Sequence, residues 1–159
     1  MNSYFSRYTK LDRSITNWMG KIGLRVLRIS IGIIFTWFGF LKFFEGLSPA
    51  EGLAIKTIDT VTFGFLPEQV IIYGLAALET VIGIGLLFNL FLRETLLLLY
   101  LQMIGTFLPI FLFPSEVFLR IPYAPTLEGQ YIFKNLVVIG AGIVLGATVR
   151  GARLVKVPA

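Results

Sequence analysis

The chain has 159 residues, of which 56% are hydrophobic and only 14% are charged, and its formal net charge is +5. An average soluble domain is about 25% charged, and a small one leaves a large share of its surface in water. A chain this short cannot bury so much apolar surface. The composition therefore excludes a soluble globular domain and a disordered chain, and it predicts a single-domain integral membrane protein.

The sequence contains neither Cys nor His. This excludes disulfide and thiol chemistry, Cys/His metal sites, His-ligated haem and a His general base, so we expect no metal site and no intrinsic cofactor. The positive charge does not indicate nucleic acid as a partner. The basic residues cluster near the two ends of the chain and flank apolar segments, which is typical of membrane proteins.

The first apolar segment covers residues 22–44 and follows a polar tail, residues 1–20, in which we expect a short surface helix around residues 15–19. A membrane-spanning helix needs about 20 apolar residues, and the uncharged core of this segment is shorter. Long basic side chains at its two ends can complete the span: Arg25, Arg28 and Lys42. We predict that Arg25 and Arg28 contact lipid phosphate.

The stretch after the first span predicts a short amphipathic helix at the membrane interface. Ser48-Pro49-Ala50-Glu51 is a capping box with Pro at the first helical position. Gly64 can end this helix. Between these two points the apolar residues fall on one helical face, which is typical of a helix lying on a membrane: Ala54, Ile55, Ile58 and Val61.

Three further apolar segments follow, at residues 67–92, 95–115 and 126–149. Pro109 lies inside the second of them, where we expect it to kink the helix and to free the carbonyl of Gly105. Close packing of membrane helices depends on small residues. We expect that role here for several Gly and Thr residues: Gly32, Thr36, Gly39, Gly74, Thr80, Gly83, Gly85, Gly142 and Gly146.

The fold prediction is all-α: a four-helix transmembrane bundle, residues 21–150, with a short amphipathic helix between the first and second spans. Four spans place both ends of the chain on the same side of the membrane. Basic residues predominate on that side and acidic residues on the other. The positive-inside rule therefore predicts that the N-terminal tail and a C-terminal tail, residues 151–159, are cytoplasmic.

Glu79 is the most informative residue of the sequence. It follows Glu68 by eleven positions, which places it about 16 Å along a helix, near the centre of the bilayer. A charge at that depth costs about 2.5–3.5 kcal/mol. We therefore expect Glu79 to face the bundle interior and to be paired or protonated. Lys134 in the fourth span is the predicted partner, whereas Lys42 is expected near the outer boundary.

Other polar residues near the membrane suggest a pocket that opens outward, with Glu79 at its floor. The candidate residues for a ligand pocket or buried ion pair are Lys42, Glu79, Gln102, Glu128, Gln130, Lys134 and Asn135. The alternative is structural: Glu79 and Lys134 only hold the bundle together, and Lys42 only reaches the membrane surface from a helix end. The residues assign no catalytic group, so activity by this chain itself stays open.

Several runs of the sequence resemble the DoxX family of small bacterial membrane proteins. Leu27-Arg28-Ile29-Ser30-Ile31-Gly32-Ile33-Ile34-Phe35-Thr36-Trp37-Phe38-Gly39-Phe40-Leu41-Lys42 is similar to the first helix of that family. Glu79 and the run Thr126-Leu127-Glu128-Gly129-Gln130-Tyr131-Ile132-Phe133-Lys134-Asn135-Leu136 match the same pattern. The resemblance covers about residues 22–153. It implies a four-helix bundle in the bacterial cytoplasmic (inner) membrane and highlights Lys42, Glu79 and Lys134.

The resemblance also implies a loose association with redox work. Some relatives look like membrane subunits of thiosulfate–quinone oxidoreductases, and others are linked to oxidative and thiol stress. The leading hypothesis is therefore a membrane subunit or anchor of a redox system, with quinone as a candidate ligand. Its partners would be the lipid bilayer, other membrane or soluble redox subunits, or a second copy of the chain. Two alternatives stay open: a non-catalytic accessory or scaffold subunit, and a small proton-coupled transporter.

Overall fold

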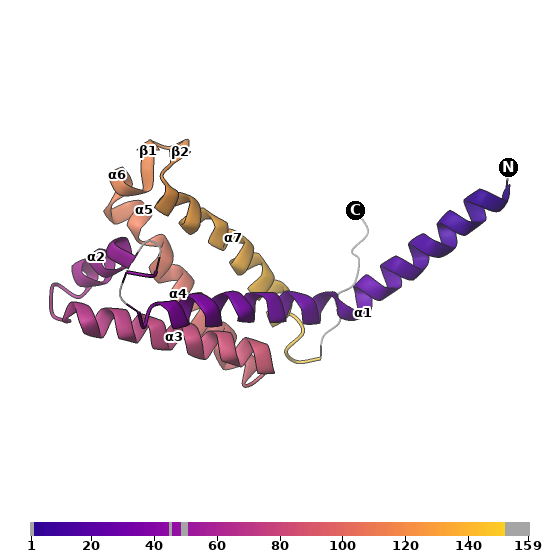
Figure 1. The fold of residues 1–159 in the computed structure, drawn as a ribbon, viewed down its shortest axis with the longest axis horizontal. Helices are drawn as coiled ribbons and strands as arrows, with labels where there is room; N and C mark the ends of the chain where they lie inside the picture. Colours follow the sequence, from indigo (N-terminus) through magenta and orange to yellow (C-terminus); the bar gives the residue numbers. More distant parts are fainter. Residues whose placement is uncertain (1, 45, 49–50, 152–159) are drawn as a thin grey trace.

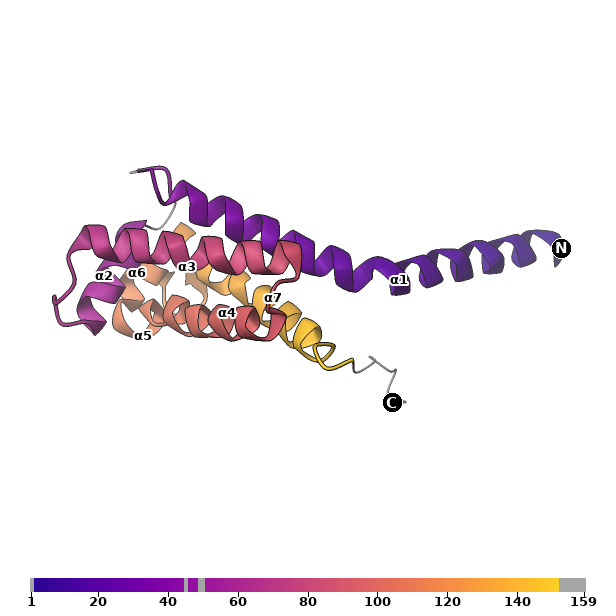
Figure 2. The ribbon, with the colours of Figure 1, turned by 90° about the horizontal axis from the view of Figure 1, so that it is seen from below.

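The computed structural model of the chain describes residues 2–44, 46–48 and 51–151, with side chains from residue 9 onward. Four of its helical segments are long and apolar enough to cross a membrane, and Figures 1 and 2 show them packed into an elongated bundle. The predicted all-α four-helix architecture is confirmed. In chain order the elements are α1 (Asn2–Leu41), α2 (Glu51–Val61), α3 (Glu68–Phe88), α4 (Leu92–Phe107), α5 (Pro109–Leu112), α6 (Pro114–Val117), β1 (Phe118–Arg120), β2 (Ala124–Pro125) and α7 (Leu127–Gly146).

Helix α1 is much longer than the predicted first span. The described part of the expected tail, residues 2–20, is helical and continuous with the span. Forty helical residues extend about 60 Å, whereas the hydrocarbon core of a bilayer is about 30 Å thick. Part of α1 must therefore lie outside the hydrocarbon, and Figure 1 shows its N-terminal part projecting from the bundle.

The second span begins where Pro67 predicts it and ends earlier than expected, because the chain turns at Asn89. That residue has a left-handed backbone (φ 57°) and its N–H bonds the carbonyl of Gly85. In the third span, Pro109 interrupts the helix as predicted and separates α4 from α5. The carbonyl of Gly105 is not left free, however, because it accepts the N–H of Leu108 at 3.2 Å.

The predicted amphipathic helix is present as α2, and the chain turns after it at Gly64, whose φ is +72°. Pro49 and Ala50 of the predicted capping box lie outside the described residues. Helix α2 packs with α6 and the start of α7 through a small apolar cluster in which Leu53, Val117 and Ile132 are buried. The antiparallel β1–β2 hairpin precedes α7, whose N-cap Thr126 accepts the N–H of Gly129 at 3.1 Å.

The main core lies where α1, α3, α4 and α7 meet. Its buried members are Ile31, Phe35, Ile82, Leu86, Leu96, Leu99, Met103, Ala141 and Leu145. Small residues bring the helices close on two sides of this core. A Cβ built on Gly142 would lie 3.1 Å from the Tyr100 hydroxyl of α4, whereas Gly74 has nothing within 4 Å. The packing role predicted for Gly74 is therefore wrong.

The closest helix pair is α1 with α3, which run antiparallel. A Cβ on Gly39 would lie 2.7 Å from the main-chain N of Thr80. One turn away, a Cβ on Gly83 would collide with the main chain of Thr36. About two turns away, a Cβ on Gly32 would lie 2.9 Å from the main-chain N of Leu87. These contacts fix the register, so that the C-terminal end of α1 lies opposite the middle of α3.

Candidate functional site

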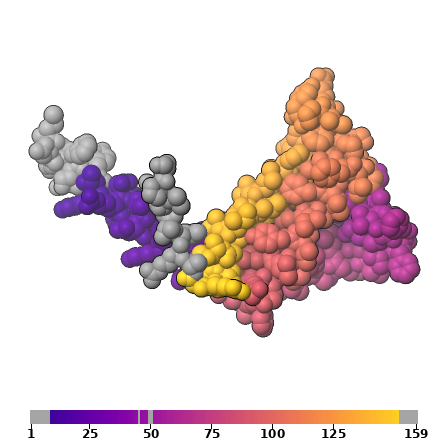
Figure 3. Space-filling model, turned by 180° about the vertical axis from the view of Figure 1, so that it is seen from behind, coloured from indigo at the N-terminus to yellow at the C-terminus, as the bar shows by residue number. Residues whose placement is uncertain are grey.

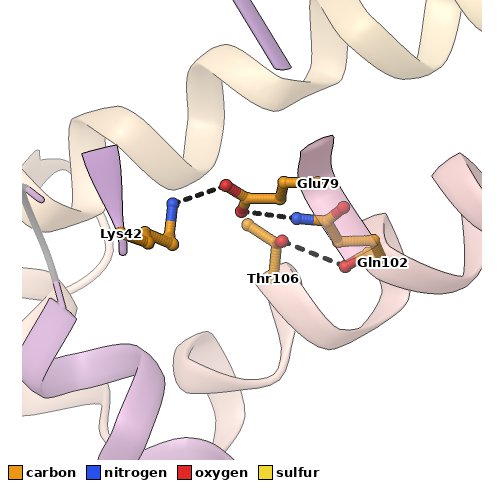
Figure 4. A network of polar contacts seen from close by, with 4 residues as sticks. All are labelled: Lys42, Glu79, Gln102 and Thr106. Carbon is orange, nitrogen blue, oxygen red and sulfur yellow. Dashed lines mark hydrogen bonds and ion pairs between the residues drawn. The ribbon is translucent and has the colours of Figure 1, made fainter. Parts of the chain in front are cut away.

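The candidate site is centred on the carboxylate of Glu79, in the middle of α3. The residue is only 9% exposed, and both of its carboxylate oxygens have partners. Oε2 accepts a hydrogen bond from the Lys42 ammonium at 2.6 Å, and Oε1 accepts one from the Gln102 amide at 2.6 Å. Figure 4 shows the three side chains converging from the end of α1, from α3 and from α4.

Lys42 reaches Glu79 because of the α1–α3 register. It follows Leu41, the last residue of α1, and its own N–H still bonds the carbonyl of Gly39 at 3.2 Å. Because Gly39 lies against Glu79 and Thr80, the next turn of chain brings Lys42 to the depth of the carboxylate. Its side chain is 12% exposed, as is that of Glu79. The Lys42 side chain is therefore buried inside the bundle beside Glu79, while its position near the outer boundary of the membrane stays a prediction.

Gln102 closes the other side of the carboxylate. Its amide nitrogen donates to Glu79, but its Oε1 is buried and has no hydrogen-bond partner among the residues that the structure describes. Thr106, one turn further along α4, donates its hydroxyl to the main-chain carbonyl of Gln102 at 3.0 Å (Figure 4). A buried acceptor without a partner costs about 1–3 kcal/mol, so the unmet oxygen marks a position where a donor would be stabilising.

The predicted Glu79–Lys134 ion pair is wrong. Lys134 is exposed, and its ammonium lies 5.1 Å from the centroid of the Tyr131 ring. The buried face of the first turns of α7 carries Gly129 and Ile132. Lys134 is two residues past Ile132, about 200° around the helix, so it points away from the interior. Both Glu79 oxygens are already bonded to other partners.

The remaining predicted pocket residues also lie on α7 and do not join the site. Glu128 and Asn135 are half-buried and Gln130 is exposed. Within the described part of the chain, no hydrogen bond or ion pair joins any of these three to Glu79. The structure thus brings together three of the seven predicted residues, Lys42, Glu79 and Gln102. Sequence reasoning missed Thr106, although its i+4 spacing from Gln102 places it on the same face of α4.

The two arginines expected at lipid phosphate differ from each other. Arg25 is exposed. Arg28 is half-buried, and its Nη1 donates to the main-chain carbonyls of Leu86 and Leu87, the latter at 3.0 Å. These carbonyls belong to the last turn of α3, where helix geometry leaves them without partners and the helix dipole favours a positive charge. Arg28 therefore stabilises the end of α3, and contact of Arg25 and Arg28 with lipid phosphate stays a prediction.

The site offers hydrogen-bonding and proton-exchanging groups. The Lys42 ammonium has three N–H donors, of which one is used by Glu79, and Gln102 has one unused acceptor. Among the described residues, no cluster of His, Cys, Asp and Glu could hold a metal ion. A separate hollow of about 360 Å³ lies between α2 and the start of α3, lined in part by Lys56, Asp59 and Glu68, and does not include Glu79.

The fold and the site define a multi-pass membrane protein with a buried ion pair between its first two spans. The carboxylate of this pair also accepts a hydrogen bond from a glutamine side chain of the third span. The DoxX family model matches residues 23–113, which include Lys42, Glu79 and Gln102, and the chain belongs to the DoxX family. The match ends before α7, so it does not include the run of residues 126–136 that also resembles the family. Searches of curated proteins and of solved structures gave no match.

Proposed function

We propose that this DoxX-family protein is a membrane subunit of a quinone-linked redox system, in which the Lys42–Glu79–Gln102 cluster binds the quinone head group. The observation that carries the proposal is the buried Oε1 of Gln102, which has no partner in the described part of the chain and lies beside an ion pair in the middle of a membrane span. Ionisable groups at that depth are costly and are usually functional. The proposal includes a location in the bacterial inner membrane, with both ends of the chain in the cytoplasm.

The polar groups of the cluster fit both redox forms of a quinone. A carbonyl oxygen of the quinone would accept a hydrogen bond from the Lys42 ammonium, and a hydroxyl of the quinol would donate one to Oε1 of Gln102. Reduction of a quinone to a quinol takes two electrons and two protons. The Lys42–Glu79 pair would pass protons to the ring oxygens. The sequence has no Cys or His, so a partner redox protein would supply the electrons.

The competing function is a scaffold subunit, and one observation favours it: both Glu79 oxygens are already satisfied by protein groups. In a scaffold, the cluster would only lock α1, α3 and α4 together. Removal of the Gln102 acceptor distinguishes the two functions. In a redox subunit its removal would abolish quinone binding. In a scaffold its removal would leave the binding of partner proteins unchanged.

The test is purification of the full chain with its native lipids, followed by quinone analysis of the lipid extract and thermal melting with an added short-chain quinone. We expect quinone in the wild-type extract and a rise in Tm on addition. Glu79→Gln and Gln102→Met should lose both effects, and Lys134→Gln, at an exposed position of α7, should keep them. A wild-type protein that carries no quinone and melts at the same temperature with and without it would contradict the proposal.

A further inference from the structure

The N-terminal part of α1 projects from the bundle in the described structure (Figure 1). Every residue from 9 to 21 is exposed. Further along the helix, Leu27 packs against the main core and Arg28 bonds the end of α3. Figure 3 shows the indigo part of α1 standing away from the body of the molecule. Helix α1 is about twice as long as the hydrocarbon core of a bilayer is thick, and this exposed stretch is the part that the span does not need.

The projecting helix is amphipathic. Its four large apolar side chains fall within an arc of about 100° at the helical repeat, and each is between 45% and 60% exposed: Leu11, Ile15, Trp18 and Met19. Three basic residues flank this stripe or lie across the helix from it: Lys10, Arg13 and Lys21. Asp12 is the one acidic residue between positions 9 and 21. An apolar stripe with Trp beside basic residues is typical of helices that lie in a membrane interface.

The junction between the projecting and packed parts allows a change of direction. Gly20 and Gly23 lie there, and a Cβ on either would meet nothing within 4 Å. Glycine in a helix interior lowers its stability and is a common position for a bend. Figure 1 shows α1 changing direction between the two parts. The projecting helix can therefore approach the membrane surface without disturbing the contacts of the bundle.

We propose that residues 9–21 of α1 lie in the interface of the leaflet at which α1 enters the membrane, and that this segment binds anionic lipid. The apolar stripe faces the boundary of the acyl chains, and Lys10, Arg13 and Lys21 contact negatively charged headgroups. Two arguments favour lipid over a second copy of the helix. The segment is continuous with a membrane span, and its excess of basic residues matches an anionic surface, whereas two copies would repel each other.

The chain provides its own reporter, because it contains only two Trp residues. Trp37 lies in the apolar part of α1, is 64% exposed and is outside the candidate site. Trp37→Phe therefore leaves Trp18 as a single fluorophore in the full-length protein. We would reconstitute this variant in nanodiscs of neutral lipid and of lipid containing phosphatidylglycerol. Lipid brominated at shallow acyl positions would measure contact with the membrane, and acrylamide would measure contact with water.

We expect brominated lipid to remove most of the Trp18 emission, with stronger quenching in the anionic discs. The double change Leu11→Ser/Ile15→Ser should abolish the quenching, and Asn17→Ser, on the polar side of the helix, should preserve it. Lys10→Gln/Arg13→Gln should abolish the difference between anionic and neutral discs. All of these positions are exposed in the projecting helix, so the melting temperature of the four spans should not change.

Two results would overturn the proposal. If acrylamide quenches Trp18 and brominated lipid does not, the projecting helix lies in water. If neither quenches Trp18, in discs that hold two chains, the projecting helix lies against a second copy.

Discussion

Gly39 of α1 lies against Thr80 of α3 so closely that a Cβ at position 39 would be 2.7 Å from the Thr80 main-chain nitrogen. This contact sets the register of the first two spans. Lys42 follows three residues later, and Glu79 precedes Thr80, so the same contact delivers an ammonium group to a carboxylate 2.6 Å away. The packing of two small residues thus determines which basic residue neutralises the acid in the middle of the membrane.

Gly39→Ala should destabilise the protein, because the added methyl group meets the Thr80 main chain and the Glu79 Cβ, neither of which is a flexible side-chain end. We expect a loss of about 1–3 kcal/mol in the free energy of unfolding. Denaturant titration in mild detergent would measure it. Gly74→Ala in α3 is the matched control, since nothing lies within 4 Å of that position and Ala is the better helix former. Equal effects of the two changes would contradict the proposed contact.

Removing either charge of the buried pair should destabilise the protein strongly, because the other charge is left without a partner. For Lys42→Met and for Glu79→Gln we expect losses of about 3–5 kcal/mol each. The double variant should lose much less than the sum, since the two side chains contact each other directly. A double-mutant cycle in the unfolding free energy measures this coupling.

The control for the pair is Lys134→Met, which removes the partner expected from sequence alone. Lys134 is exposed, so its replacement should change the stability by less than about 0.5 kcal/mol. Coupling of Glu79 to Lys134 in the same kind of cycle, with none to Lys42, would show that the pairing described above is wrong.

Arg28→Met should weaken the end of α3, because the main-chain carbonyls of Leu86 and Leu87 lose a charged donor. Hydrogen bonds to charged groups are worth about 1.5–3 kcal/mol, and we expect a loss in that range. Amide hydrogen exchange in the last turn of α3 should rise together with it. Arg25→Met, one turn earlier in α1 and exposed, should leave both quantities nearly unchanged. Identical exchange in the two variants would exclude the capping role.

The second ion pair, Lys56 with Glu116, should matter far less than the first. It joins α2 to α6, and its side chains are 50% and 42% exposed. Pairs in water are screened and contribute about 0–1 kcal/mol. Glu116→Gln should therefore lower the melting temperature slightly at low salt, and the difference from wild type should vanish at high salt. A large effect that persists at high salt would contradict this estimate.

The number of spans, α2, the break at Pro109 and the turn at Gly64 were predictable, because each depends on local pattern: apolar length, capping, or the backbone limits of Pro and Gly. The small residues of α1 and most of those of α3 were also identified correctly. The partner of Glu79 was not. The depth of a residue along one helix follows from counting residues. The register between two helices depends on which of their small residues contact each other, and one helix alone does not reveal it.

The same distinction explains the other corrections. Residue counting places Lys134 at a suitable depth, but its position around α7 relative to Ile132 directs it outward. A single helix also does not reveal that the end of α3 lies beside Arg28, so the sequence does not predict that its guanidinium bonds the carbonyls there. The length of α1 was underestimated because residues 2–20 are polar, and their weaker amphipathic pattern was interpreted as a tail with a short helix.

The order in which the charged groups of the site are synthesised has a consequence for membrane insertion. Lys42 and Glu79 both belong to the first two spans, so their opposite charges can neutralise each other before α4 and α7 exist. The acid can enter the lipid together with its counter-ion as one hairpin. Gln102 arrives only with the next span, and its amide then occupies the second carboxylate oxygen of a pair that is already assembled.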